Sequence, residues 1–156
     1  MTGDIWLTET QQGVWRDWLD VQARLLAALN RQLQADHDLS LQDFEVLVQL
    51  SEAPDEKLRL TPLAEALRWE QSRLSHHLTR MAKRGLVSKE PCPNDARGSL
   101  ACLTPAGRNR LEAAAPSHAA LVRSLLFTGL NEAGVTALGD ANKAILAALD
   151  RAEQDA

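Results

Sequence analysis

The chain has 156 residues, 45% of them hydrophobic, and a formal net charge of -4. This length and composition suit one compact domain, or one domain with appended helices. No run approaches the roughly 18 uncharged apolar residues of a membrane span, and the start, MTGDIWLTET, lacks the basic residues and apolar core of a signal peptide. We therefore expect a cytoplasmic protein with no membrane partner. Two cysteines, without zinc-type spacing, predict reduced thiols and no bound metal.

The N-terminal segment is predicted to form one long amphipathic helix. Apolar residues recur at helical spacing from Val14 to Leu33, which indicates a helix over about residues 9–36. Thr8, followed three residues later by Gln11, is typical of a capping box at the start of such a helix.

Two shorter helices are expected next. Ser40 is placed to cap a second helix, which ends at Ala53-Pro54-Asp55. Thr61-Pro62 predicts the start of a third helix over about residues 62–68, because threonine can cap free amides and proline is tolerated at the first helical position.

A fourth helix follows a tight break near Trp69. Its buried side is marked by Leu74, Leu78 and Met81, and Gly85 is expected to end it.

The remainder is predicted to be a hairpin and two further helices. Residues 86–90 and 99–103 are expected to form short strands. Thr104-Pro105 repeats the helix-start signal for a helix over about residues 105–127, and residues 131–150 indicate a last helix rich in alanine and leucine. The predicted order is four helices, a hairpin and two helices.

Basic residues are concentrated in one part of this acidic chain. Residues 57–110 contain eleven lysines and arginines and four acidic residues, a local charge of +7. A solvated basic face is an alternative explanation. Affinity for nucleic acid depends on local charge, however, because phosphate neutralisation and counterion release drive it.

The fourth helix is predicted to present a polar face opposite its apolar side. Serine, threonine, histidine and arginine can hydrogen-bond base edges or phosphates, and a helix of this kind fits the major groove. The polar face collects Ser72, His76, Thr79, Arg80 and Lys83, with Arg73 on its shoulder. We expect His76 to be a contact residue and His77 to pack against the second helix.

The segment 94–98, NDARG, is predicted to be a sharp turn with Arg97 at its tip. An arginine there can enter a narrow minor groove, where the negative potential is enhanced. The alternative is a plain surface hairpin in which Arg97 pairs with Asp95.

These motifs resemble the MarR family of winged helix-turn-helix transcriptional regulators over essentially the whole chain. The most specific pieces are DARG at 95–98 and LTPAG at 103–107, which are similar to the family's D-x-R wing tip and L-T-x-x-G helix entry. A second piece is SRLSHHLTRM at 72–81, running into RGLV at 84–87.

The resemblance implies a mainly α fold with a small β wing, and a homodimer that binds a pseudo-palindromic site in double-stranded DNA, most often as a repressor. It implies an N-terminal dimerisation helix in residues 1–39, a winged helix-turn-helix domain in 40–104, and C-terminal dimerisation helices in 105–156. Carried over by position, DNA contacts would come from Gln71, Ser72, Arg73, Ser75, His76, Thr79, Arg80 and Arg97. Lys83, Arg84 and Lys89 are assigned to phosphates by charge and location.

One departure concerns the start of the fourth helix. Many family members have a small serine-type cap there, whereas this chain has Trp69-Glu70. Glu70 is a weaker cap, although its charge can favour the helix N-terminus. This makes Gln71 and Ser72 less secure contacts than Arg73 or Arg97.

The family commonly responds to small aromatic ligands held between the dimerisation helices and the winged domain. Trp15, Arg16, Trp18 and His37 are the candidates for such an effector pocket. Tryptophans at helical spacing are also ordinary core or dimer-interface residues, which is the alternative interpretation.

Cysteine-based oxidant sensing is a minor alternative. Cys92 and Cys102 are expected near the base of the hairpin, conceivably opposite each other, where oxidation would distort the wing. The simpler expectation is that Cys102 is a small buried filler and Cys92 a thiol on the wing surface.

Two other classes of protein were weighed. The motifs G-x-S-x-G, G-x-x-x-x-G-K and H-E-x-x-H are missing from the sequence, so we expect neither catalysis nor a cofactor. A winged-helix module that binds an acidic protein is the stronger rival. The fourth helix, however, offers a polar face rather than the aromatic anchors of a protein hot spot.

Overall fold

The computed structural model describes residues 5–155, apart from the side chains of Ala96 and Arg97. The chain divides into two compact units between His118 and Ala119. The three-part division into dimerisation and DNA-binding segments stays a prediction, since it concerns assembly rather than compactness.

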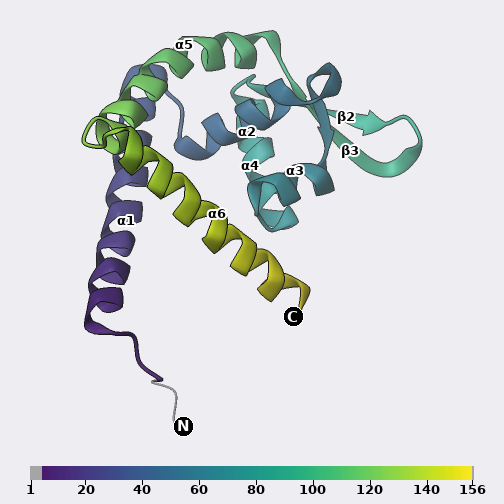
Figure 1. Ribbon diagram of the computed structural model, residues 1–156. Helices are drawn as coiled ribbons and strands as arrows, with labels where there is room; N and C mark the ends of the chain where they lie inside the picture. The colour runs from purple at the N-terminus through teal and green to yellow at the C-terminus, as the bar shows by residue number, and fades with distance from the viewer. Residues whose placement is uncertain (1–4, 156) are drawn as a thin grey trace. The chain divides into compact units, whose positions relative to one another are not determined.

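In its described part, from residue 5 onward, the first unit contains five helices and a three-stranded sheet, with a 3-10 turn before the first strand (Figure 1). The helices are α1 (Glu9–His37), α2 (Leu41–Glu52), α3 (Leu60–Leu67), α4 (Gln71–Lys83) and the start of α5 (Pro105–Val122). The strands are β1 (Lys57–Arg59), β2 (Val87–Cys92) and β3 (Asp95–Leu103), and the turn is η1 (Pro54–Glu56).

The second unit continues the chain from Ala119. After the last residues of α5 it contains a π-helical turn, η2 (Arg123–Phe127), and a long helix, α6 (Glu132–Gln154). The predicted helix over 105–127 is therefore α5 followed by η2. Asn131 caps α6 by accepting a 2.8 Å hydrogen bond from the amide of Gly134.

The predicted caps of the first two helices are confirmed. Thr8 and Gln11 form a reciprocal capping box at the start of α1. Ser40 forms another with Asp43 at the start of α2. Each box satisfies two backbone amides that the helix leaves free, so both helix starts are fixed by local sequence.

The prediction that Thr61 caps the third helix is wrong. Helix α3 begins at Leu60, two residues before the predicted start, and its N-cap residue Arg59 makes no side-chain capping bond. Strand β1 runs directly into the helix, so the backbone direction is set by the sheet. The Thr61 hydroxyl instead accepts a 2.9 Å hydrogen bond from Nε2 of Gln71.

The sheet is antiparallel, with strand order β1-β3-β2. Strand β1, which the sequence analysis did not predict, pairs Leu58 with Ala101. The chain reverses at Pro93-Asn94 rather than within residues 94–98. Proline pre-sets the backbone for a turn at that point, so β3 already begins at Asp95.

Arg97 therefore lies within β3. The prediction that it lies at the tip of a turn is wrong. The register shifts between Pro91 and Cys92, so Cys92 faces Asp95 whereas Pro91 faces Ser99. Residues 96–98 therefore form an irregular stretch of β3 between these two pairs.

The core of the first unit lies between the helices and the sheet. The predicted buried side of α4 is confirmed, because Leu74, Leu78 and Met81 are all fully buried. They pack in a core that also contains Leu33, Leu39, Leu47, Leu50, Leu63 and Leu86.

Two glycines fix the ends of the helices next to the sheet. Gly85 has a positive φ of 75°, where the absence of a side chain lets the chain leave α4 without strain. A Cβ on Gly107 would lie 2.0 Å from the carbonyl oxygen of Leu86. The glycine of LTPAG therefore allows the first turn of α5 to approach the backbone before β2.

Among the described residues, no helix combines the length and apolar character that crossing a bilayer would need.

Candidate nucleic-acid interface

Helix α4 carries two adjacent groups of polar side chains, on the part of its surface that the buried apolar residues leave free. We call the first the outer face; it consists of Ser72, Ser75, His76, Thr79 and Lys83. All of these are exposed except the half-buried Ser75. We call the second the inner flank; it consists of Arg73, His77, Arg80 and Arg84, which recur at helical spacing and line a cavity beside α2.

The outer face receives one further basic side chain from the sheet. Lys89 of β2 donates a 2.9 Å hydrogen bond from Nζ to the hydroxyl of Thr79, and its Nζ lies 3.4 Å from the carbonyl of Ser75. The Thr79 hydroxyl itself donates to that carbonyl over 2.9 Å. Strand β2 thus places a positive charge directly beside the hydrogen-bonding groups of α4.

The start of α4 is held by aromatic and polar contacts to the preceding turn. The guanidinium of Arg73 lies 4.5 Å from the ring centroid of Trp69, a cation-π distance. The ring of His77 meets Trp69 edge-on at 5.3 Å. Glu70 is the N-cap residue and makes no side-chain capping bond, as its type predicts.

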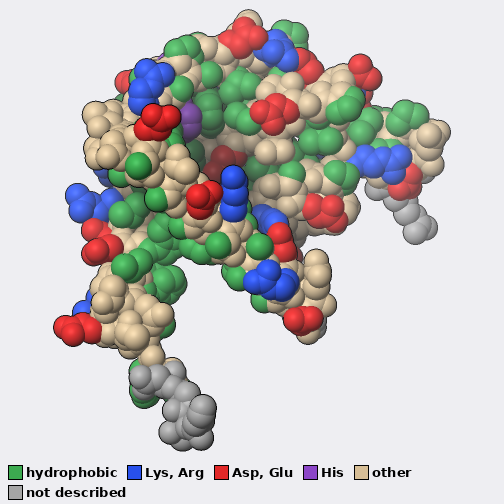
Figure 2. Space-filling view, in the orientation of Figure 1, with side chains coloured by type: hydrophobic (Ala, Val, Ile, Leu, Met, Phe, Trp, Pro, Cys, Tyr) green, Lys and Arg blue, Asp and Glu red, His purple; other side chains and the backbone are tan. Residues whose placement is uncertain are grey.

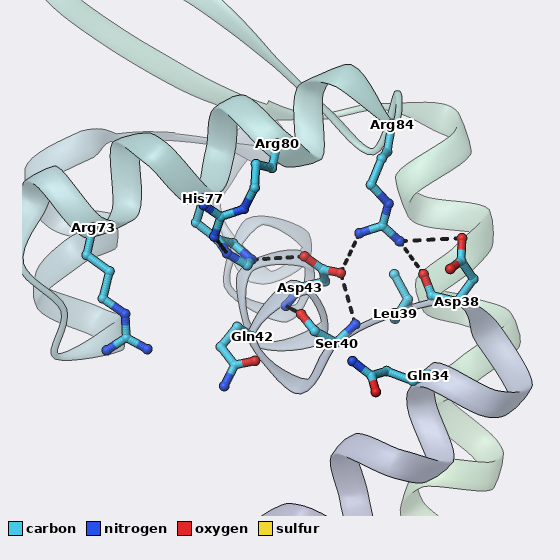
Figure 3. Close-up of a pocket in the computed structure, with 10 residues that line it drawn as sticks. All are labelled: Gln34, Asp38, Leu39, Ser40, Gln42, Asp43, Arg73, His77, Arg80 and Arg84. Atoms are coloured by element: carbon cyan, nitrogen blue, oxygen red, sulfur yellow. Dashed lines mark hydrogen bonds and ion pairs between the residues drawn. The ribbon is translucent and has the colours of Figure 1, made fainter.

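The inner flank borders a cavity of about 490 Å³ (Figure 3). Two guanidinium groups and one imidazole reach it from α4, and a third guanidinium reaches it from the C-cap residue Arg84, opposite the end of α1 and the start of α2. The lining residues from that opposite side are Gln34, Asp38, Leu39, Ser40, Gln42 and Asp43.

A buried carboxylate, that of Asp43, joins α2 to the inner flank. Its Oδ2 accepts hydrogen bonds from Nη1 of Arg84 at 2.6 Å and from the amide of Ser40 at 2.9 Å. Its Oδ1 lies 2.9 Å from Nε2 of His77. Asp43 is not among the predicted site residues, although its position three residues after Ser40 is the signal of a capping box.

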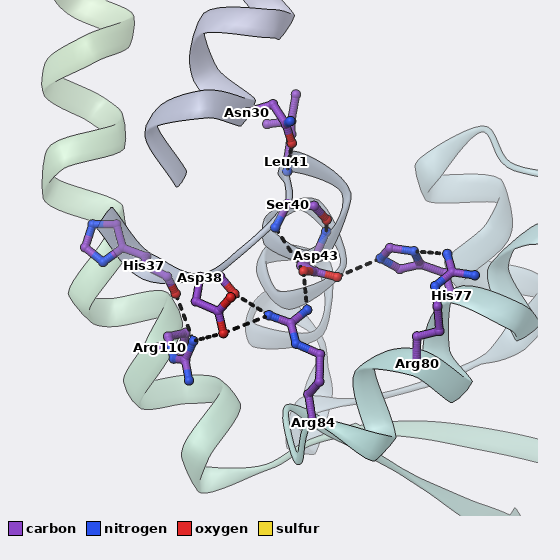
Figure 4. A network of polar contacts seen from close by, with 10 residues as sticks. All are labelled: Asn30, His37, Asp38, Ser40, Leu41, Asp43, His77, Arg80, Arg84 and Arg110. Atoms are coloured by element: carbon purple, nitrogen blue, oxygen red, sulfur yellow. Dashed lines mark hydrogen bonds and ion pairs between the residues drawn. The ribbon is translucent and has the colours of Figure 1, made fainter. Parts of the chain in front are cut away.

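The same contacts extend to the end of α1 and to α5 (Figure 4). Arg84 also donates to the carbonyl of Asp38. Arg110 of α5 donates to the carbonyl of His37 at 2.8 Å, and its Nη1 lies 3.5 Å from the Asp38 carboxylate. The expectation that His77 packs against the second helix is confirmed, since the side chain is 12% exposed beside Asp43.

The chain is similar to known proteins in both sequence and structure. The model of the MarR family matches residues 39–99. AbsC, a MarR family transcriptional regulator from Streptomyces coelicolor, is 39% identical with a TM-score of 0.88, over 94% of this chain and 99% of that chain. The chain belongs to the MarR family. No match was found among curated proteins.

Two solved MarR family structures contain DNA. Sco3205 from Streptomyces coelicolor, in complex with DNA, is 36% identical with a TM-score of 0.88, over 94% of this chain and 91% of that chain. A mutant of MarR from E. coli, complexed with operator DNA, is 26% identical with a TM-score of 0.78, over 86% and 94% of the two chains.

The MarR-type contact residues suggested by the sequence fall into three groups in the structure. Those of the outer face and Lys89 converge on one exposed surface. Arg73, Arg80 and Arg84 belong instead to the inner flank, where Arg84 is held by two carboxylates. The side chain of Arg97 lies outside the described residues, and Gln71 is bonded to Thr61.

The residues suggested for a MarR-type effector pocket do not come together. Trp15 and Trp18 are 51% and 38% exposed on α1, and Arg16 is exposed beside them. His37 is turned toward α5, with its Nε2 2.9 Å from the hydroxyl of Ser117. None of the four lines the cavity beside the inner flank or the two cavities next to α3.

A second cavity, of about 400 Å³, has a mostly apolar wall formed by α1, α2, α3 and His118. Its lining residues are Leu26, Leu29, Leu41, Phe44, Glu45, Val48, Gln49, Ala66, Leu67 and His118. Burial raises the pKa of Glu45 and lowers that of His118. Nδ1 of His118 is buried without a hydrogen-bond partner among the described residues.

Both cysteines are buried. Cys92, expected on the wing surface, is 5% exposed, and Cys102 is 3% exposed. They are not opposite each other, because Cys102 pairs with Ser88 and Cys92 with Asp95. Burial raises the pKa of the Cys102 thiol, which disfavours the reactive thiolate.

Proposed function

We propose that the chain is a sequence-specific regulator of transcription that binds double-stranded DNA through the outer face of α4. The observation that carries this proposal is the exposed row of Ser72, His76, Thr79 and Lys83, supplemented by Lys89 from the sheet. Such side chains can hydrogen-bond base edges, and the lysines can neutralise phosphates. The DNA complexes of Sco3205 and MarR support it.

The proposed contact set follows the structure. Gln71, Ser72, Ser75, His76 and Thr79 are assigned to the major groove, Arg73, Arg80, Lys83 and Lys89 to its edges and phosphates, and Arg97 to the minor groove. Arg84 is removed from the set, because its guanidinium is held by Asp43 and Asp38.

We further propose that the protein binds as a homodimer. Apolar side chains reach the surface along α1 (Figure 2), among them Val14, Trp15, Trp18 and Leu19. The second unit has no buried residue among those described, and exposes Leu125, Leu130, Val135, Ile145, Leu146 and Leu149. Apolar surface of this extent on helices is typical of an interface. A dimer supplies the symmetry for a pseudo-palindromic site.

Selection of binding sites from a random pool of duplexes tests this function. The expected result is enrichment of a pseudo-palindrome whose half-sites lie about 10 base pairs apart, centre to centre, or a multiple of that spacing. Failure to enrich any sequence would contradict sequence-specific binding. Enrichment of a single half-site would be consistent with sequence-specific DNA binding but would contradict binding as a homodimer.

We also propose that the protein is a repressor released by a small, mainly apolar effector, which binds in the 400 Å³ cavity rather than near Trp15 and Trp18. A cavity of this size suits a small ligand. Leu29→Trp should fill it. We expect this variant to bind DNA as the wild type does but to lose release by compounds that free the wild type from DNA, measured by fluorescence anisotropy. Unchanged release would contradict this location.

A further inference from the structure

The carboxylate of Asp43 connects α2 to two separate points on α4. Its side chain is 5% exposed. Its Oδ2 accepts hydrogen bonds from the amide of Ser40 and Nη1 of Arg84, and its Oδ1 lies 2.9 Å from Nε2 of His77 (Figure 4). A carboxylate buried to this degree is costly unless its oxygens are fully paired. Here the pairing partners are supplied mainly by the helix whose outer face is proposed to contact DNA.

The contacts also define the protonation of the group. Burial raises the pKa of Asp43, but the hydrogen bonds from His77, Ser40 and Arg84 outweigh it and hold the pKa well below its usual range. Nδ1 of His77 lies 3.0 Å from Nη2 of Arg80, which can only donate. His77 therefore accepts at Nδ1 and carries its proton on Nε2, which lies 2.9 Å from Oδ1 of Asp43.

The two attachment points constrain how α4 is rotated about its axis. His77 and Arg84 are seven positions apart, which is about two helical turns, or roughly 10 Å along the axis. A rotation of about 20° would move side-chain ends some 6 Å from the axis by about 2 Å. That displacement breaks a hydrogen bond, since donor and acceptor must lie within about 3.2 Å.

We propose that Asp43 is a positioning residue for DNA recognition: through His77 and Arg84 it fixes the rotation of α4, and so determines which base edges the outer face reaches. This inference rests on the proposed function. The inference concerns discrimination between DNA sequences more than sequence-independent affinity for DNA. That affinity depends on exposed lysines and arginines, which stay in place when the contacts of Asp43 are lost.

Asp43→Asn is the direct test, with Glu52→Gln as the control that removes one negative charge from an exposed residue of α2. The dissociation constants for the selected binding site and for a scrambled duplex are measured at one salt concentration. For Asp43→Asn we expect the ratio of the two constants to fall about tenfold, the effect of losing one good base contact. Affinity for the scrambled duplex should change less than about twofold, and Glu52→Gln should retain the wild-type ratio.

A merely structural role gives a different result, because a lower fraction of folded protein changes both constants by the same factor. A folded Asp43→Asn variant with the wild-type ratio would overturn the inference. A wild-type protein with no preference between the two duplexes would overturn the proposed function itself.

His77 provides a second test, which decides the question if circular dichroism shows that Asp43→Asn does not fold. His77→Gln keeps an N–H donor for Asp43, whereas His77→Leu removes it. We expect the glutamine variant to retain the ratio within about twofold and the leucine variant to lose it. Equal ratios in two folded variants would overturn the inference.

Discussion

The outer face and the inner flank of α4 carry similar kinds of side chain but differ in what those side chains contact. On the outer face, Lys83 is exposed and Lys89 contacts the hydroxyl of Thr79 and the carbonyl of Ser75. On the inner flank, Arg84 is held by Asp43 and Asp38. The number of basic residues is therefore larger than the number that are available to bind phosphates. Whether a basic residue is available depends on the groups that it already contacts.

The largest expected effect is on stability, and it should differ between two arginines of the inner flank, Arg84 and Arg80. Arg84→Met leaves the buried Asp43 carboxylate without its closest partner. We expect the free energy of unfolding to fall by about 2 kcal/mol, below the value for a fully buried pair because Arg84 is partly exposed. Urea denaturation measures it. The matched control, Arg80→Met, should cost less than about 0.5 kcal/mol, and equal losses would contradict the distinction.

Base contacts on the outer face should give the next largest effect. Thr79→Ala removes a hydroxyl that the account assigns to the major groove. We expect it to relax discrimination at one position of the binding site by about 1 kcal/mol, measured by titrating duplexes with single base-pair changes. A uniform loss of affinity over all duplexes would assign Thr79 to the phosphate backbone instead.

Phosphate contacts should be seen in the salt dependence. Lys89→Ala is expected to weaken binding to all duplexes alike and to reduce the slope of log K against log salt by about 0.9. Lys143→Ala, on α6 in the second unit, is the control and should leave the slope unchanged. A Lys89 variant with the wild-type slope would exclude it from the phosphate contacts.

The smallest expected effect is on how the free energy of unfolding depends on pH in acid. Because the pKa of Asp43 in the folded state lies below its ordinary value of 3.8, the unfolded chain binds the proton first. Its stabilising contribution is complete above about pH 4 and is lost as the pH falls further. We expect Asp43→Asn to show a shallower loss of unfolding free energy below pH 4 than the wild type. Parallel curves would mean that the carboxylate is not held ionised by its partners.

Local sequence predicted the helices well, for identifiable physical reasons. The capping box at Thr8 and the cap at Ser40 act over three residues, and the buried side of α4 follows from the period of Leu74, Leu78 and Met81. Each of these signals lies within one helix or its cap. The polar outer face of α4 was predictable on the same basis.

The features that were missed depend on residues far apart in the chain. Strand β1 has three residues and exists because it pairs with β3, more than forty positions later. Arg84 was assigned to phosphates from its charge and location, because its partner Asp43 lies 41 positions away and the sequence does not show that the two residues meet. The turn at Pro93-Asn94 was placed too late because Asp95 and Gly98 are also turn-forming residues, and only the register of β3 distinguishes the alternatives.

The most direct test of the account is binding of the wild-type protein to DNA from upstream of its own gene and to a scrambled duplex, by fluorescence anisotropy at two salt concentrations. The account predicts tighter binding to the native fragment and a steep loss of affinity for both duplexes as salt rises. Absence of binding to either duplex at low salt, or affinity that does not respond to salt, would contradict it.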